Sequence, residues 1–139
     1  MLKYPLAYVV TGVIFAALDF GWISWATPKL YRPEIGSILI EGVRPIPAVL
    51  FYLLYVLAMT GLCVLPGIEQ RSWARGAGSG ALLGIAAYAA YDLTNQATLK
   101  LWSTKVTIAD LCWGTFATAV ASALAVVVCG LILRNGSRA

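Results

Sequence analysis

The fold class of this chain is most evident between Val106 and Leu133, which read VTIADLCWGTFATAVASALAVVVCGLIL. The one charged side chain of this stretch is Asp110, near its start. About 20 mostly apolar residues are enough for a helix to cross a bilayer, and this stretch is longer. It is rich in Ala, Leu and Val and lacks the period-two alternation of a barrel strand. The stretch therefore predicts a transmembrane helix.

Three further apolar runs of about the same kind precede it, at residues 5–26, 46–66 and 77–99. The first contains Asp19, the third contains Asp92, and the second contains no charged residue. The chain is 60% apolar and 12% charged, whereas soluble domains are about 25% charged. Residues 1–139 are therefore predicted to form one integral-membrane domain, an all-α polytopic membrane protein with four transmembrane helices.

Proline and polar residues predict where these helices begin and end. Thr27-Pro28 and Pro66-Gly67 are expected to end the first and second helices, because the residue before proline avoids the helical region. Thr107 is the expected N-cap of the fourth helix. The first span is long, aromatic and charged, so we expect it to be retained rather than cleaved as a signal peptide.

Composition excludes several functions. The chain has no histidine, which excludes His-ligated haem, HExxH zinc sites and a His-based triad. Cys63, Cys112 and Cys129 are too far apart for a CxxC motif and are expected to behave as small apolar residues. No cofactor or metal is expected. The basic residues are scattered singly, so we expect no nucleic-acid partner and place the net charge of +4 at lipid headgroups.

Charge counting does not orient the protein, because five Lys and Arg residues lie on the side of the termini and five on the other. Lys3 and the free amino terminus precede the first span. On that basis we expect both termini to be cytoplasmic.

A short internal similarity suggests a repeat. Residues 17–19 and 26–31 read ALD and ATPKLY, and residues 90–92 and 97–102 read AYD and ATLKLW. If the match is not coincidence, the protein consists of two parallel two-helix repeats related by rotation about the membrane normal. Asp19 and Asp92 would then lie at matching depths, with Asp110 entering from the same face.

Small and polar residues recur every four positions on the third and fourth spans. Small residues at this spacing allow helix backbones to approach closely, so we expect these two stripes to face inward. The stripes are Gly76, Gly80, Gly84, Tyr88 and Asp92 on one helix, and Asp110, Gly114, Thr118 and Ser122 on the other.

The candidate site consists of polar and aromatic residues near the intramembrane carboxylates: Asp19, Trp22, Tyr88, Asp92, Asn95, Asp110 and Trp113. One interpretation is structural, with Asp19 accepting a hydrogen bond from an indole and Asp92 accepting one from a Tyr hydroxyl or Asn95. The other is a ligand-binding or proton-handling site. No Lys or Arg lies well inside a span, and neighbouring buried carboxylates do not all ionise.

Three strings make the chain similar to a known family: YDLTNQATLKLW at residues 91–102, LDFGW at 18–22 and DLCWG at 110–114. With these in order on four short spans, the chain resembles the bacterial membrane family called domain of unknown function 2177. The resemblance implies a multi-pass protein of the bacterial inner membrane. It implies no activity and no catalytic residue. Ser103 stands where the family pattern suggests proline, which affects only a loop.

Three functions remain open. The first is a small carrier or receptor for a lipidic or cationic small molecule. The second is an enzyme or accessory subunit of membrane lipid modification, which we rank lower because no nucleophile–base pair is visible. The third is a structural assembly partner. The expected partners are membrane lipids, a small-molecule ligand, and a second copy or another membrane protein.

Overall fold

The computed structural model describes residues 2–136 and contains helices and no strand within that range. Four long helices dominate: α1 (Lys3–Ala26), α3 (Pro45–Met59), α5 (Trp73–Thr98) and α6 (Thr104–Gly136). Two short helices, α2 (Arg32–Ile35) and α4 (Leu65–Glu69), extend α1 and α3. The chain is an all-α polytopic membrane protein, as its apolar runs predict.

Three helical stretches in the described part of the chain are long and apolar enough to cross a membrane: Lys3–Ile38, Pro45–Glu69 and Thr104–Asn135. Large apolar side chains point outward on them, as a lipid environment requires; Phe20 is 74% exposed and Leu54 is 66% exposed. The fourth long helix, α5, is richer in glycine and alanine. Its Leu82 is also 71% exposed, and we expect α5 to cross beside α6.

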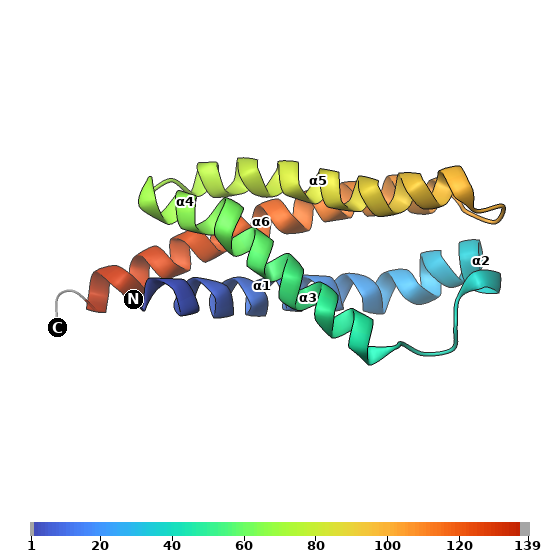
Figure 1. Ribbon diagram of the computed structural model, residues 1–139, viewed down its shortest axis with the longest axis horizontal. Helices are drawn as coiled ribbons and strands as arrows, with labels where there is room; N and C mark the ends of the chain where they lie inside the picture. Colours follow the sequence, from blue (N-terminus) through green and yellow to red (C-terminus); the bar gives the residue numbers. More distant parts are fainter. Residues whose placement is uncertain (1, 137–139) are drawn as a thin grey trace.

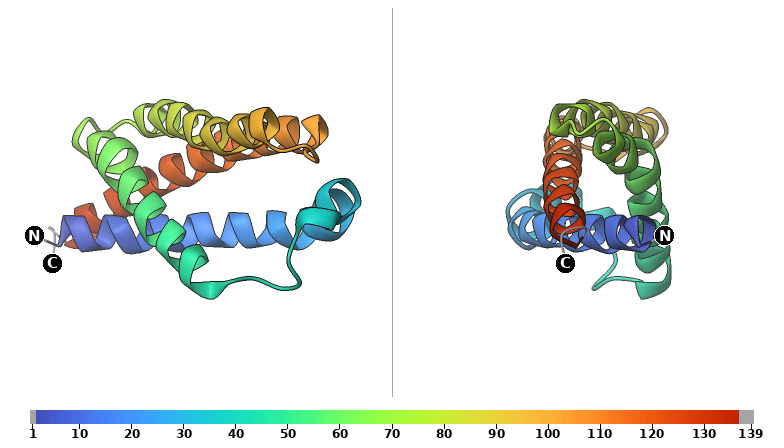
Figure 2. Two further views of the ribbon diagram at one scale, coloured as in Figure 1. Left: turned by 45° about the vertical axis from the view of Figure 1, so that its right-hand side comes forward. Right: turned by 90° about the vertical axis from the view of Figure 1, so that its left-hand side faces the viewer.

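The long helices are arranged as one close antiparallel pair, a helix beside it and a helix that crosses. Helices α5 and α6 lie antiparallel and close together away from the termini, and they diverge toward the terminal end (Figure 1). Helix α1 runs beside α6, and α3 crosses α1 obliquely (Figure 2). Both chain ends lie at the same end of the molecule. The side-by-side pair of α5 and α6 is therefore the main packed unit.

Glycine allows this close packing of α5 against α6. A Cβ added at Gly80 would lie 2.6 Å from the carbonyl oxygen of Thr118, and one at Gly84 would overlap the carbonyl group of Gly114. Gly76, Gly80 and Gly84 are all buried. The predicted inward-facing stripes of small residues are thus confirmed.

Three apolar clusters follow the long axis. Phe15, Tyr55 and Met59 belong to the central one, where α1 and α3 meet α6. A second lies toward the termini around Val64 and Cys129. The third is smaller and joins Leu30, Ile35 and Val106. This small cluster leaves more open space at its end of the molecule, where the candidate site lies.

The prediction that Thr27-Pro28 ends the first helix is wrong. A π-helical turn, Thr27–Tyr31, continues α1 directly into α2. The amide N–H of Arg32 donates to the carbonyl of Thr27, five residues back, in the wider i→i+5 pattern of a π turn. This turn accommodates the proline, which has no N–H to donate.

The prediction that Pro66-Gly67 stops the second helix is wrong for the same reason. A second π turn, Thr60–Val64, precedes the proline, and the helix continues as α4 to Glu69. Pro66 lies in the first turn of α4, where a missing N–H is tolerated.

The predicted cap at Thr107 is also wrong. Helix α6 begins three residues earlier, at Thr104, and the amide of Thr107 already donates to the carbonyl of Ser103 at 3.2 Å. The Thr107 hydroxyl instead accepts a 3.0 Å hydrogen bond from the Trp102 indole. Ser72, which was not predicted as a cap, caps α5: its Oγ accepts a hydrogen bond from the amide of Arg75.

The two halves of the chain pack differently. Helices α5 and α6 lie against each other over much of their length, whereas α1 and α3 meet where they cross (Figure 1). The rotational repeat stays a prediction.

Candidate functional site

A pocket of about 450 Å³ lies at the end of the molecule away from the termini. It is bounded by α1, the π turn and α2 on one side and by α5 and α6 on the other, with Phe51 of α3 at its edge. Its walls are mainly aromatic and aliphatic. The lining residues are Asp19, Trp22, Ile23, Tyr31, Ile35, Leu39, Phe51, Ala87, Tyr88, Tyr91, Trp102, Val106 and Asp110.

Asp19 is held in the pocket wall by two donors from other helices. Its side chain is 5% exposed. Tyr52 of α3 donates its hydroxyl proton to one carboxylate oxygen, and the Trp113 indole of α6 donates to the other at 3.3 Å. The predicted indole donor is therefore Trp113. These contacts fix Asp19 where α1, α3 and α6 meet.

Asp110 receives a hydrogen bond through a second short chain of contacts. The Trp22 indole donates to the Tyr31 hydroxyl at 2.8 Å, and that hydroxyl donates to Asp110 Oδ1 at 2.5 Å. Trp22 also stacks on Trp113, with ring centroids 4.8 Å apart and planes 6° from parallel. Trp113 donates to Asp19, and Trp22 donates to Tyr31, which in turn donates to Asp110. The stacked indoles therefore connect the two carboxylates.

Asp92 lies behind the pocket and differs from the other two carboxylates. It is completely buried, and neither carboxylate oxygen has a hydrogen-bond partner in the described part of the chain. The carboxyl group of Asp110 lies near that of Asp92. The predicted bond to a Tyr hydroxyl or to Asn95 is therefore wrong. Asn95 lies three residues on, about 60° around the helix from Asp92, but its side chain makes no hydrogen bond to the Asp92 carboxylate.

The structure brings most of the predicted residues together. Asp19, Trp22, Tyr88 and Asp110 line the pocket, and Trp113 is bonded to Asp19. Asp92 lies beside Asp110 without lining the pocket, and half-buried Asn95 does not line it either.

Two important aromatic residues were missed. Tyr31 and Tyr52 are absent from the candidate site residues named from the sequence, yet both donate to pocket carboxylates. The ALD…ATPKLY similarity placed Tyr31 opposite Trp102, and both residues do line the pocket. That similarity was the available signal.

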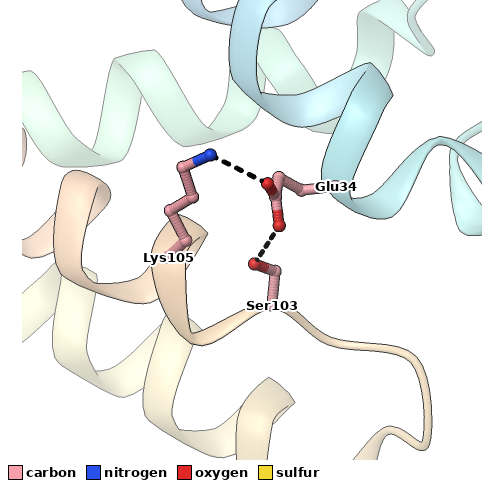
Figure 3. A network of polar contacts seen from close by, with 3 residues as sticks. All are labelled: Glu34, Ser103 and Lys105. Atoms are coloured by element: carbon pink, nitrogen blue, oxygen red, sulfur yellow. Dashed lines mark hydrogen bonds and ion pairs between the residues drawn. The ribbon is translucent and has the colours of Figure 1, made fainter.

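Polar contacts tie α2 to the loop that joins α5 and α6 and to the first turn of α6, next to the pocket. Glu34 of α2 accepts from Lys105 Nζ at 3.0 Å and from Ser103 Oγ at 2.7 Å (Figure 3). Trp102 and Val106, which line the pocket, adjoin these donors in sequence. We call Glu34, Ser103 and Lys105 the end clasp.

The pocket combines negative charge with aromatic walls. Two carboxylates line it, and none of the lining side chains is Lys or Arg. Within residues 2–136, no group of three His, Cys, Asp or Glu is arranged to hold a metal ion. A cavity of this size and composition is typical of small-molecule sites, which are mostly apolar with a few placed polar groups.

Fold and pocket together define a small polytopic membrane protein with an acidic, aromatic cavity between its helices. The chain belongs to the family described as "Predicted membrane protein (DUF2177)", whose model matches residues 4–127. The resemblance carried by the YDLTNQATLKLW string is thereby confirmed. No curated protein and no solved structure matches the chain.

Proposed function

We propose that this protein binds a hydrophobic organic cation in the pocket, as a small carrier or receptor. The observation that carries the proposal is the pair of buried carboxylates, Asp19 and Asp110, in a cavity that is otherwise apolar and has no lining Lys or Arg. A carboxylate inside a membrane protein is costly unless a partner or a function compensates it. A bound cation supplies that compensation.

The hydrogen bonds that Asp19 and Asp110 accept within the protein are compatible with binding of a cation. Tyr52 and Trp113 donate to Asp19, and Tyr31 donates to Asp110. These donors are neutral, so they orient the carboxylates without neutralising them. A ligand cation between the two carboxylates would be attracted by both, and the attraction is strong where water is excluded.

The aromatic walls favour a bulky cation over a metal ion. Trp22, Tyr31, Phe51, Tyr88 and Trp102 line the pocket. Aromatic faces attract ammonium-type cations through their quadrupoles and bury the apolar substituents around them. The volume of about 450 Å³ lies within the range for ligands of drug-like size.

Binding of a defined probe tests the proposal. The probe is tetraphenylphosphonium, added to purified protein in detergent, with neutral triphenylphosphine oxide as the matched control. Because Trp22 and Trp102 line the pocket and Trp113 contacts Asp19, tryptophan fluorescence reports occupancy. We expect saturable binding of the cation and at least about tenfold weaker binding of the neutral compound, which corresponds to about 1.4 kcal/mol.

Two variants make the test specific. Asp19→Asn and Asp110→Asn each remove one pocket charge with little change of shape, so each should weaken binding of the cation and leave binding of the neutral compound unchanged. Glu41→Gln removes one acidic charge from an exposed loop residue outside the pocket lining and should have no effect. Equal binding of both compounds, or equal effects of all three variants, would reject the proposal.

We further propose that the protein lies in the bacterial inner membrane with both termini cytoplasmic. Lys3, which lies at the start of α1, supports this orientation. Reporter fusions at each terminus, with a periplasm-active and a cytoplasm-active enzyme, test it. Activity of the periplasmic reporter at either terminus would contradict it.

A further inference from the structure

Asp92 is a buried acid that cation binding in the pocket does not by itself explain. Its side chain is completely buried, and neither carboxylate oxygen has a hydrogen-bond partner in the described part of the chain. Buried polar groups are nearly always hydrogen-bonded, and a buried charge without a partner is costly. A proton on the carboxyl group removes that charge. The surroundings of Asp92 therefore favour the neutral acid.

The packing of α5 against α6 places Asp92 beside Asp110. The two helices run antiparallel (Figure 1), and a Cβ added at Gly84 would overlap the carbonyl group of Gly114. One turn further along α5, the ring of Tyr88 lies where a Cβ of Gly114 would be. The next turn of each helix brings Asp92 to Asp110, and their carboxyl groups lie near each other. We call these two groups the carboxyl pair.

The carboxyl pair connects the pocket to a position behind it. Asp110 lines the pocket, and Asp92 does not. A ligand in the pocket can therefore reach Asp110 directly and Asp92 only through Asp110. A proton held between the two groups lies next to the place where we expect the cation to bind.

The titratable groups around the carboxyl pair are acids and phenols. They come from α1, the π turn, α3 and α5, and they are Asp19, Tyr31, Tyr52, Tyr88 and Tyr91. On α6, the ammonium group of Lys105 lies in the first turn and is paired with Glu34. Two neighbouring buried carboxyl groups in such surroundings do not both ionise. The carboxyl pair is therefore expected to hold one proton while the pocket is empty.

We propose that the pocket exchanges this proton for the cation. The inference rests on the proposed function and adds the ion that leaves when the cation binds. A cation beside Asp110 stabilises the charges of both carboxylates, so the O–H bond of the carboxyl pair breaks and the proton passes to water. One positive charge enters and one leaves, so the total charge of the site is unchanged. A carrier with this site moves a cation in one direction and a proton in the other.

Proton release on binding tests the proposal. Tetraphenylphosphonium is added to the purified protein in a weakly buffered detergent solution that contains a pH-sensitive dye, and triphenylphosphine oxide is the neutral control. We expect one proton to be released for each bound cation and none with the neutral compound. The dissociation constant of the cation should also fall by about tenfold for each unit of rise in pH, over the range in which the carboxyl pair holds its proton.

Asp92→Asn identifies the source of the proton. The variant keeps the shape of the side chain and removes the exchangeable carboxyl proton, while Asp110 still accepts from Tyr31. Cation binding should then release no proton and lose its pH dependence. Asp19→Asn should weaken binding but keep one released proton per bound cation, because the carboxyl pair is intact. Glu41→Gln, which changes an exposed loop residue, should alter neither binding nor proton release.

The outcomes separate this inference from the proposed function. Saturable binding with proton release that is lost in Asp92→Asn supports the exchange. Saturable binding without proton release, or proton release that persists in Asp92→Asn, would overturn the exchange and leave the proposed function standing. Absence of binding at every pH would overturn both.

Discussion

Replacing Asp92 with Asn should not destabilise the protein, although Asp92 is completely buried. Both carboxylate oxygens of Asp92 lack hydrogen-bond partners, and the carboxyl group of Asp110 lies near them. Asn has nearly the same shape and carries an amide that can donate to Asp110. A hydrogen bond to a charged group contributes about 1.5–3 kcal/mol, and repulsion between the two carboxylates disappears. If Asp92 holds a proton, Asn replaces one neutral donor by another, and stability stays unchanged.

The expected change in the free energy of unfolding is therefore between zero and a gain of about 3 kcal/mol. Thermal unfolding in detergent measures it, at about 3 °C of Tm per kcal/mol for a chain of this size. Probe binding is measured on the same samples. Asp92→Asn should weaken binding of tetraphenylphosphonium, because the new amide occupies an oxygen of Asp110. Asn95→Ala, which alters a half-buried residue outside the pocket lining, serves as the control.

Two results would refute this reasoning. A fall in Tm of more than about 6 °C, or about 2 kcal/mol, would mean that the Asp92 carboxylate makes a stabilising contact. Equal probe affinity of the wild type and Asp92→Asn would mean that this residue does not influence the pocket. Asp92→Leu is expected to lower stability by about 1–3 kcal/mol, because a larger side chain overpacks a filled position.

Three further changes separate packing, site and clasp. Gly84→Leu should prevent stable folding, because its Cβ would overlap a backbone carbonyl of α6, whereas Gly78→Leu should leave Tm unchanged; identical Tm values would contradict the packing. Tyr31→Phe removes the bond to Asp110 and should lower the free energy of unfolding by about 1–3 kcal/mol, measured by thermal unfolding; no change would show that this bond is unimportant. Glu34→Gln removes the ion pair of the end clasp and should change the free energy of unfolding by less than about 1 kcal/mol but accelerate probe dissociation in stopped flow; an unchanged dissociation rate would mean that the clasp does not limit release.

Much of the fold follows from two sequence patterns. The length of the apolar runs predicts the helices, because only a helix or a closed barrel satisfies backbone polar groups in lipid. The spacing of Gly76, Gly80 and Gly84 predicts which face of α5 meets α6. Helix ends were predicted less well at Pro28 and Pro66, because the proline rule assumes that the chain leaves the helix and does not consider a π turn.

The candidate site could be predicted only in part. Asp19 and Asp110 were evident as intramembrane charges, and both line the pocket. Their donors Tyr31 and Tyr52 come from distant segments, and the way α3 crosses α1 is not encoded in any local pattern. Asp92 was expected to have a polar partner because buried polar groups usually do, and the structure gives it none.

The π turn at Thr27–Tyr31 has a consequence for the phase of the helix that follows it. Each α-helical residue advances the chain by about 100° around the axis, and a π turn holds about one residue more than an α turn. Every side chain after the turn is thus rotated relative to an uninterrupted α1, and this rotation helps to aim Tyr31 at Asp110. Deleting one residue of the turn would remove this excess and carry the Tyr31 ring to another side of the helix. The position of Tyr31 in the pocket therefore depends on the one extra residue that the π turn contains. In an alignment based on sequence alone, that extra residue would appear only as a one-residue gap.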